Sequence, residues 1–184
     1  MKLLTRTAVG IAALIAAGSI WAGEPQSLQK EGGTASPYAG DNVTITSGNS
    51  ATIVNGANEY GAVYTKANLI KYVKNKLPST PIGKVSLSFV ASGTVAGGAP
   101  RFSIPIDSNL DGTVDAYAFI DVNSCNGAGF VSTTSATCKV YYTSEVFDNW
   151  AAFVAAHPKY EMLGVPFIIA DQPGTYVITS IDVK

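Results

Sequence analysis

RFSIPIDSNLDGTVDAYAFID, residues 101–121, predicts two β-strands joined by a polar loop. In its first third, the apolar residues Phe102, Ile104 and Ile106 alternate with Ser103 and Pro105. Successive side chains of a strand point to opposite faces of a sheet, so this alternation predicts a strand with one buried face. Proline has no N–H to donate to a neighbouring strand, which favours an edge strand or a bulge at Pro105.

Similar patterns lie on both sides of this hairpin. Short apolar runs separated by Gly, Asn and Pro are typical of antiparallel β-proteins. The expected strands are Val43–Thr46, Thr52–Asn55, Gly61–Thr65, Lys84–Ser92, Arg101–Ile106, Ala116–Val122, Lys139–Tyr142, Val165–Ala170 and Thr175–Val183. The pattern predicts a mainly β fold: an antiparallel two-sheet sandwich of jelly-roll type with one or two short helices, or alternatively a small barrel.

Two segments have apolar residues at helical spacing. Lys66–Lys76 is expected to be a helix ending before Pro78, although its LIKYV run is equally compatible with a strand. Asp148–Ala156 is a clearer helix, with Asp148 as the expected N-cap and an apolar stripe that includes Trp150 and Phe153.

The N-terminus has the features of a cleavable signal peptide, residues 1–22. Lys2 and Arg6 precede a short apolar run at residues 8–17, and small residues follow, so cleavage is expected after Ala22 or, alternatively, Ser19. The run is too short for a spanning helix, so no membrane insertion is expected after cleavage. The expected location is extracellular or periplasmic.

The rest of the chain divides into a flexible arm at 23–40 and a single domain at 41–184. The arm has few apolar side chains, and about 145 residues are enough for one hydrophobic core. Without the leader, ten basic residues face 13 acidic ones, a formal net charge of −3. A net negative domain without a Lys/Arg cluster argues against nucleic-acid binding.

Cys125 and Cys138 are the only two cysteines, and export to an oxidising compartment predicts a disulfide between them. They enclose residues 126–137. Closing a loop of this size contributes about 3 kcal/mol by restricting the unfolded chain. The C-x-x-C spacing of redox pairs is absent.

Residues 107–115, DSNLDGTVD, form the one motif that suggests a ligand. Calcium prefers six to eight oxygen ligands, and alternate oxygen-bearing residues in a turn can supply them. The expected ligands are the side chains of Asp107, Asn109, Asp111 and Asp115 and the carbonyl of Thr113, with Gly112 at the sharp turn. Alternatively, Asp, Asn and Gly serve only as favoured turn residues.

The loop resembles the D-x-[DN]-x-D-G-x-x-D calcium hairpins of secreted FG-GAP and VCBS proteins. It departs from an EF-hand because Ala118 occupies the twelfth position. The resemblance implies a structural Ca²⁺. Residues 97–121 and 165–183 are also similar to stretches of small secreted bacterial β-sandwich proteins of unassigned activity, a resemblance that implies no catalytic residues.

Catalytic motifs are sparse. His157 is the only histidine, and no G-x-S-x-G nucleophile motif occurs. A glycoside hydrolase with paired carboxylates, drawn from acids such as Glu145 and Glu161, is the remaining enzymatic alternative. The sequence therefore predicts a non-catalytic protein.

Two non-enzymatic functions remain. The first is a carbohydrate- or surface-binding module, with a glycan or cell-surface ligand stacked on Tyr60, Tyr64 and Tyr141. The second is a structural or adhesive cell-surface protein that donates its N-terminal arm or an edge strand to a neighbour. The oligomeric state is left open.

Overall fold

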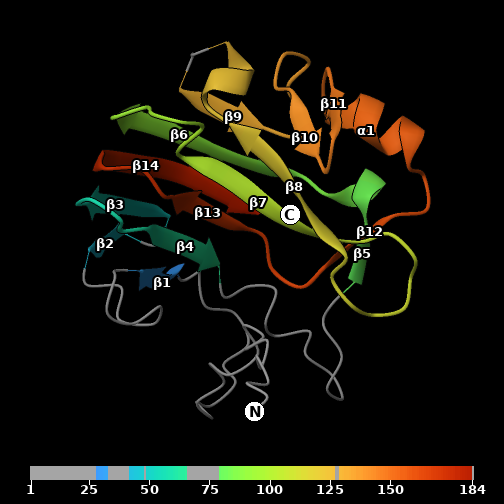
Figure 1. Ribbon diagram of the computed structural model, residues 1–184, viewed down its shortest axis with the longest axis horizontal. Helices are drawn as coiled ribbons and strands as arrows, with labels where there is room; N and C mark the ends of the chain where they lie inside the picture. Colours follow the sequence, from blue (N-terminus) through green and yellow to red (C-terminus); the bar gives the residue numbers. More distant parts are fainter. Residues whose placement is uncertain (1–27, 33–41, 48, 66–78, 127–128, 184) are drawn as a thin grey trace, which may run out of the picture.

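The computed structural model describes residues 28–32, 42–47, 49–65, 79–126 and 129–183. The expected signal peptide and the expected helix at Lys66–Lys76 lie outside these residues. The described chain forms two antiparallel sheets (Figure 1), which confirms the predicted mainly β sandwich. None of its helices is long and apolar enough to cross a membrane.

Sheet A contains nine of the described strands and sheet B contains five. The order in sheet A is β1 (Leu28–Gly32), β4 (Gly61–Thr65), β13 (Phe167–Ala170), β7 (Arg101–Asp107), β8 (Ala116–Asp121), β10 (Val140–Tyr142) and β11 (Glu145–Phe147), while β12 (Glu161–Leu163) pairs with β7 and β5 (Ser79–Pro81). The order in sheet B is β2 (Val43–Ser47), β3 (Ser50–Asn55), β14 (Gly174–Val183), β6 (Leu87–Gly93) and β9 (Phe130–Ser132).

Eight strands form the jelly-roll centre of the sandwich. The consecutive pairs β3–β4, β13–β14, β6–β7 and β8–β9 each place one strand in each sheet. The four pairs follow one another in the same order in both sheets, β4-β13-β7-β8 in sheet A and β3-β14-β6-β9 in sheet B. This wrapping of paired strands around a common core is the arrangement of a jelly roll.

The core lies between the sheets, where the predicted alternation places the apolar side chains. Phe89 of β6 and Phe102 of β7 come from opposite sheets, and their rings meet edge to face at 4.9 Å. Ile53, Ile104 and Tyr176 are also fully buried. Strand β6 begins at Leu87, later than predicted, because Ile82–Lys84 forms a 3-10 turn.

Pro105 lies in a central strand, which corrects the expectation of an edge or bulge. On one side, β7 pairs with β13 at residues 101–103 and with β12 at 106–107. Pro105 falls between these two partners, so its missing N–H interrupts no ladder on that side. On the other side it is the register partner of Tyr117.

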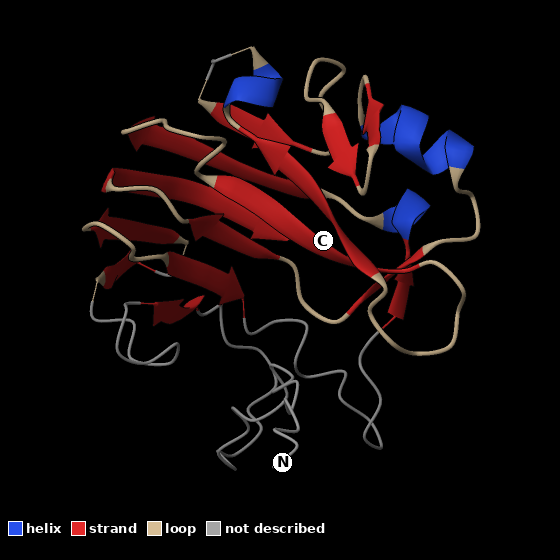
Figure 2. Cartoon of the chain, viewed as in Figure 1, coloured by secondary structure: helices blue, strands red, loops and turns tan. Residues whose placement is uncertain are grey.

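Helix α1 (Trp150–Ala156) confirms the second expected helix, with a different N-cap. Asn149, and not Asp148, caps it, because the Asn149 side chain accepts a hydrogen bond from Ala152 N at 2.9 Å. The indole of Trp150 donates to the carbonyl of Ile82 at 3.0 Å. These contacts hold α1 beside the 3-10 turn at one end of the sandwich (Figure 2).

Part of the expected N-terminal arm is ordered. Strand β1 pairs with β4 over five residues, from Leu28 opposite Thr65 to Gly32 opposite Gly61. Residues 28–32 therefore belong to sheet A, which corrects the expectation of a flexible arm for this part.

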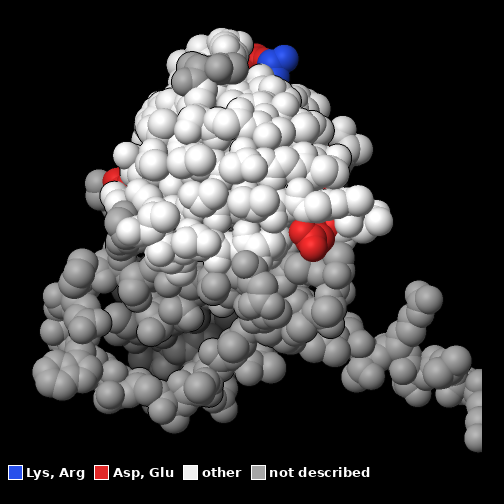
Figure 3. Space-filling model, turned by 90° about the vertical axis from the view of Figure 1, so that its left-hand side faces the viewer, with Lys and Arg blue, Asp and Glu red and all other residues white. Residues whose placement is uncertain are grey.

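Few charged side chains interrupt the described surface at the end where β3 and β6 finish (Figure 3). Only 14% of the whole chain is Asp, Glu, Lys or Arg. Hydroxyl and amide groups therefore supply much of the polar surface.

Candidate functional site

Aromatic side chains form a row across the outer face of sheet A. Directly opposed residues of antiparallel strands point to the same side of a sheet. The row, one residue per strand, is Tyr64 (β4), Phe167 (β13), Ser103 (β7), Phe119 (β8), Tyr141 (β10) and Val146 (β11). Neighbours along these strands, such as Phe102, Ile120 and Val140, are fully buried in the core. The row therefore faces away from sheet B.

Tyr117 closes the gap that Ser103 leaves in this row. Its ring meets that of Phe167 edge to face at 5.9 Å and stacks near that of Phe119 at 6.5 Å. Beneath these rings, Ser103 is only 2% exposed although it points outward. The aromatic surface is therefore continuous from β13 to β8.

The row is most exposed at its β10–β11 end. Tyr141 is 37% exposed and Val146 is 58% exposed, while Phe119 and Phe167 are half-buried. A contiguous apolar surface outside the core is typical of an interaction site.

A buttressed arginine flanks the row. Arg101 donates two hydrogen bonds to Asp171, Nη1 to Oδ1 at 2.8 Å and Nη2 to Oδ2 at 2.6 Å. Its guanidinium carbon lies 5.4 Å from the centroid of the Phe119 ring. The hydrogen bonds from Arg101 lower the pKa of Asp171, against the opposing effect of burial. Asp171 engages only part of the donor set of the guanidinium, so polar groups stand beside the aromatic surface.

The structure brings together two of the three tyrosines predicted from the sequence. Tyr64 and Tyr141 lie in the same cross-strand row. Tyr60 directly precedes β4, and its carbonyl accepts a hydrogen bond from Asn42 at 2.8 Å. Sequence reasoning missed Phe119 and Phe167, although both occupy outward positions of expected strands.

The loop at 107–115 is organised around the carboxylate of Asp107. This side chain is 2% exposed. Its Oδ1 accepts from Leu110 N at 2.6 Å and its Oδ2 accepts from Gly112 N at 2.9 Å. Leu110 and Gly112 have positive φ values of 64° and 85°, which the turn requires. Because glycine adopts such angles without strain, Gly112 suits this turn.

The other acids of the loop also accept hydrogen bonds from within it. Asp111 accepts from the hydroxyl and from the backbone N–H of Thr113, and these bonds lower the pKa of Asp111. Asp115 accepts from the hydroxyl of Ser108 at 2.6 Å and from its N–H at 2.8 Å, and these bonds lower the pKa of Asp115. Both side chains are therefore anionic at neutral pH.

The predicted calcium ligands share one loop, and several of their oxygens accept hydrogen bonds within it. Within the described residues, no group of three or more His, Cys, Asp or Glu side chains is placed to hold a metal ion. Asn109 Oδ1 accepts from Asp111 N at 2.9 Å. An ionised carboxylate has about four lone-pair sites, so these side chains can accept the loop hydrogen bonds and still bind a cation.

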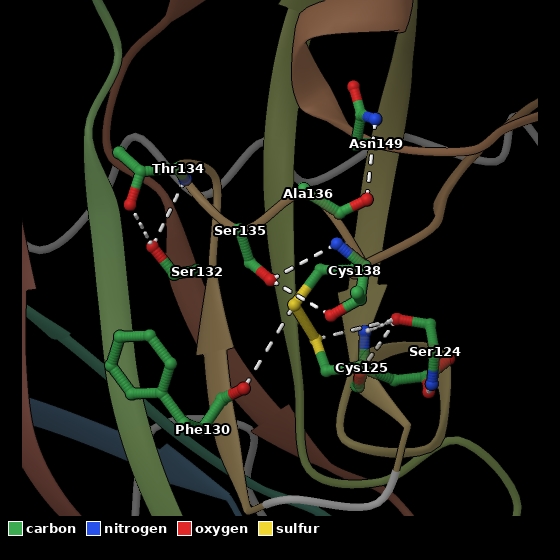
Figure 4. Close-up of a disulfide and its surroundings, with 11 residues drawn as sticks. Ser124, Cys125, Phe130, Ser132, Thr134, Ser135, Ala136, Cys138 and Asn149 are labelled. Carbon is green, nitrogen blue, oxygen red and sulfur yellow. Dashed lines mark hydrogen bonds between the residues drawn. A yellow bond between two sulfur atoms is a disulfide. The ribbon is translucent and has the colours of Figure 1, made fainter.

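The predicted disulfide between Cys125 and Cys138 is confirmed (Figure 4). Cys125 ends a 3-10 turn after β8, and Cys138 stands just before β10. Between them the chain crosses to sheet B, pairs as β9 with β6, and returns to sheet A. A backbone bond from Lys139 N to Ser124 O, 3.0 Å long, runs beside the bridge. The disulfide therefore ties both ends of this excursion together.

His157 lies in an aromatic cluster at the end of α1. Its ring stacks on that of Tyr160 at 4.3 Å and also contacts Phe153. Its Nε2 is 3.3 Å from a carboxylate oxygen of Glu145. Packing against these neighbours therefore accounts for the position of the His157 ring.

No protein-family model matches the sequence, and no match was found among curated proteins. Function is therefore inferred from the residues and contacts described above.

Proposed function

We propose that the protein is a secreted, non-catalytic β-sandwich that binds carbohydrate through the outer face of sheet A. The observation that carries this proposal is the cross-strand row of Phe167, Phe119 and Tyr141. Ser103 separates the first two in register, and the ring of Tyr117 fills the space between them. A jelly roll alone would carry no such conclusion, because one fold serves many functions.

Sugar rings and aromatic rings are complementary in chemistry. One face of a pyranose presents C–H groups, and the negative face of an aromatic ring attracts their partial positive charge. The hydroxyls at the rim of the sugar need polar partners, which Arg101 and Asp171 offer beside Phe119. A row of rings with polar groups at its side suits such a ligand.

The alternative is an adhesive protein that donates its N-terminal arm or an edge strand, and donation of the arm is less favoured. Residues 28–32 already pair with β4 in the same chain. Donation to a neighbour would first have to break these backbone hydrogen bonds.

Two further properties belong to the proposal. The loop at 107–115 binds a structural calcium ion, with the anionic side chains of Asp111 and Asp115 among its ligands. The Cys125–Cys138 bridge supports export, because disulfides persist in oxidising compartments.

Retention on immobilised neutral polysaccharides tests the proposed carbohydrate binding. We expect the purified protein to be retained by at least one polysaccharide and Tyr141→Ala to lose most of that retention. Phe130→Ala is the matched control, because Phe130 is an exposed aromatic residue on the outer face of sheet B, 46% exposed. Equal losses in both variants, or no retention of the wild type on any polysaccharide, would contradict the proposal.

A further inference from the structure

We infer that the ligand is a single, extended chain of neutral, β-linked sugars, lying along the aromatic row and crossing the strands, and not the flat surface of a crystalline polysaccharide. This inference rests on the proposed carbohydrate binding and specifies the class of ligand.

The first argument is the direction and length of the row. Its members come from successive strands, so the row runs across the strands of sheet A. Four inter-strand steps separate Tyr64 from Tyr141, a span of about 19 Å at about 4.8 Å per step, and Val146 extends it to about 24 Å. A sugar unit in an extended β-linked chain advances by about one such step, so the row fits about four or five units.

The second argument is the twist of the sheet. Adjacent strands in a sheet are rotated by about 20–25° on average. The rings of the row are therefore rotated relative to one another. Each strand turns its side chain a little further about the axis of the row. A single chain can rotate about its glycosidic bonds to follow this change. The flat face of a crystal cannot, and would meet only a part of the row at a time.

The third argument is the balance of charge beside the row. Arg101 is neutralised by Asp171. The guanidinium and the carboxylate lie side by side next to Phe119, so the cation nearest to the row is already paired with an anion. A row whose neighbouring arginine is already paired in this way favours a neutral sugar chain over a uronic-acid polymer.

Titration calorimetry with oligosaccharides of two to six units tests the inference. The probes are β-1,4-linked gluco-, manno-, xylo- and N-acetylglucosamine series, with an α-1,4-linked glucose hexamer and a microcrystalline β-1,4-glucan as comparisons. For the series that binds, we expect the affinity to rise at least tenfold from two units to four or five, and then to level off. The α-linked hexamer is expected to bind at least tenfold more weakly than the best β-linked hexamer, and the microcrystalline glucan to deplete little protein.

Val146→Ala tests the length argument at the exposed end of the row. We expect it to weaken the five- and six-unit chains severalfold. Val90→Ala, on the outer face of sheet B, should change neither.

Two kinds of failure are distinguishable. Equal affinity for two and six units, or strong depletion by the microcrystalline glucan, would overturn the extended-chain inference while carbohydrate binding still stood. Failure of every sugar probe to bind would overturn both.

Discussion

The guanidinium of Arg101 lies over the ring of Phe119, 5.4 Å from its centroid. Residue 101 begins β7 and residue 119 lies in β8, so this contact crosses between neighbouring strands on the outer face of sheet A. Asp171 holds the guanidinium with two hydrogen bonds. The arginine is thereby fixed at the edge of the aromatic row, where a ligand can use its other donors.

The Arg101–Asp171 pair gives an acid-sensitive contribution to stability. The folded protein lowers the pKa of Asp171, mainly through the hydrogen bonds from Arg101. A carboxyl group with a lowered folded pKa adds stability above its unfolded pKa, about 3.9, and loses it as the pH falls through the folded value. Because the Asp171 side chain is 34% exposed, we expect no more than about 1 kcal/mol.

Urea unfolding at pH 7, 4, 3 and 2 measures this contribution. Asp171→Asn is expected to be less stable than the wild type at pH 7, and the difference should shrink below about pH 4. A difference that stays constant from pH 7 to pH 2 would show that the carboxylate charge does not carry the effect.

The disulfide is expected to stabilise the fold by restricting the unfolded chain. Replacing Cys125 and Cys138 together by serine removes the tie across the β9 excursion, at a cost of about 3 kcal/mol. Denaturant unfolding of the oxidised wild type, the reduced wild type and the double variant measures the change. The last two should unfold at similar, lower midpoints, and a reduced wild type as stable as the oxidised one would contradict the prediction.

Trp150 anchors α1 to the end of the core. It is 4% exposed and donates to the carbonyl of Ile82, so Trp150→Ala leaves both a cavity and an unsatisfied acceptor. We expect a loss of about 3–5 kcal/mol in chemical unfolding followed by circular dichroism. Ala155→Ser, at an exposed position of the same helix, should change stability by less than about 0.5 kcal/mol. Similar small effects of both variants would show that α1 is not anchored through Trp150.

Calcium should raise the thermal midpoint if the loop at 107–115 binds it. A gain of about 1 kcal/mol corresponds to about 2–4 °C for a domain of this size. Thermal unfolding in EDTA and in millimolar calcium should differ for the wild type and for Asp148→Ala, an exposed acid outside the loop. Asp111→Ala should lose the difference. If calcium leaves the wild type unchanged, residues 107–115 form a polar turn held by its own hydrogen bonds.

Local sequence patterns predict those strands and helices whose signal lies within a few consecutive residues. The hairpin at 101–121 and helix α1 follow from alternation and helical spacing within a few residues. The strands β5, β9, β11 and β12 have three residues each, which is too few for a periodic signal. They form because the fold places partner strands beside them. The shift of the N-cap from Asp148 to Asn149 reflects two adjacent residues that can both cap a helix.

The sequence predicts less of the candidate site, because the site depends on the pairing of strands that are distant in the chain. Tyr64 and Tyr141 were predicted to stack on a ligand, but the residues that connect them lie on strands distant in the sequence. Phe167 joins the row only because β13 inserts between β4 and β7. No spacing along the chain encodes that insertion.

The most direct test of the central claim is to map the bound sugar by nuclear magnetic resonance. The amide spectrum of the isotopically labelled protein is recorded during titration with the oligosaccharide that binds best. The largest shifts are expected at Phe119, Tyr141 and Val146 and at Phe167 on β13, with little change at Val54, Val90 and Phe130 on the outer face of sheet B. Shifts confined to sheet B or to the loop at 107–115 would contradict the assignment of the outer face of sheet A as the binding surface.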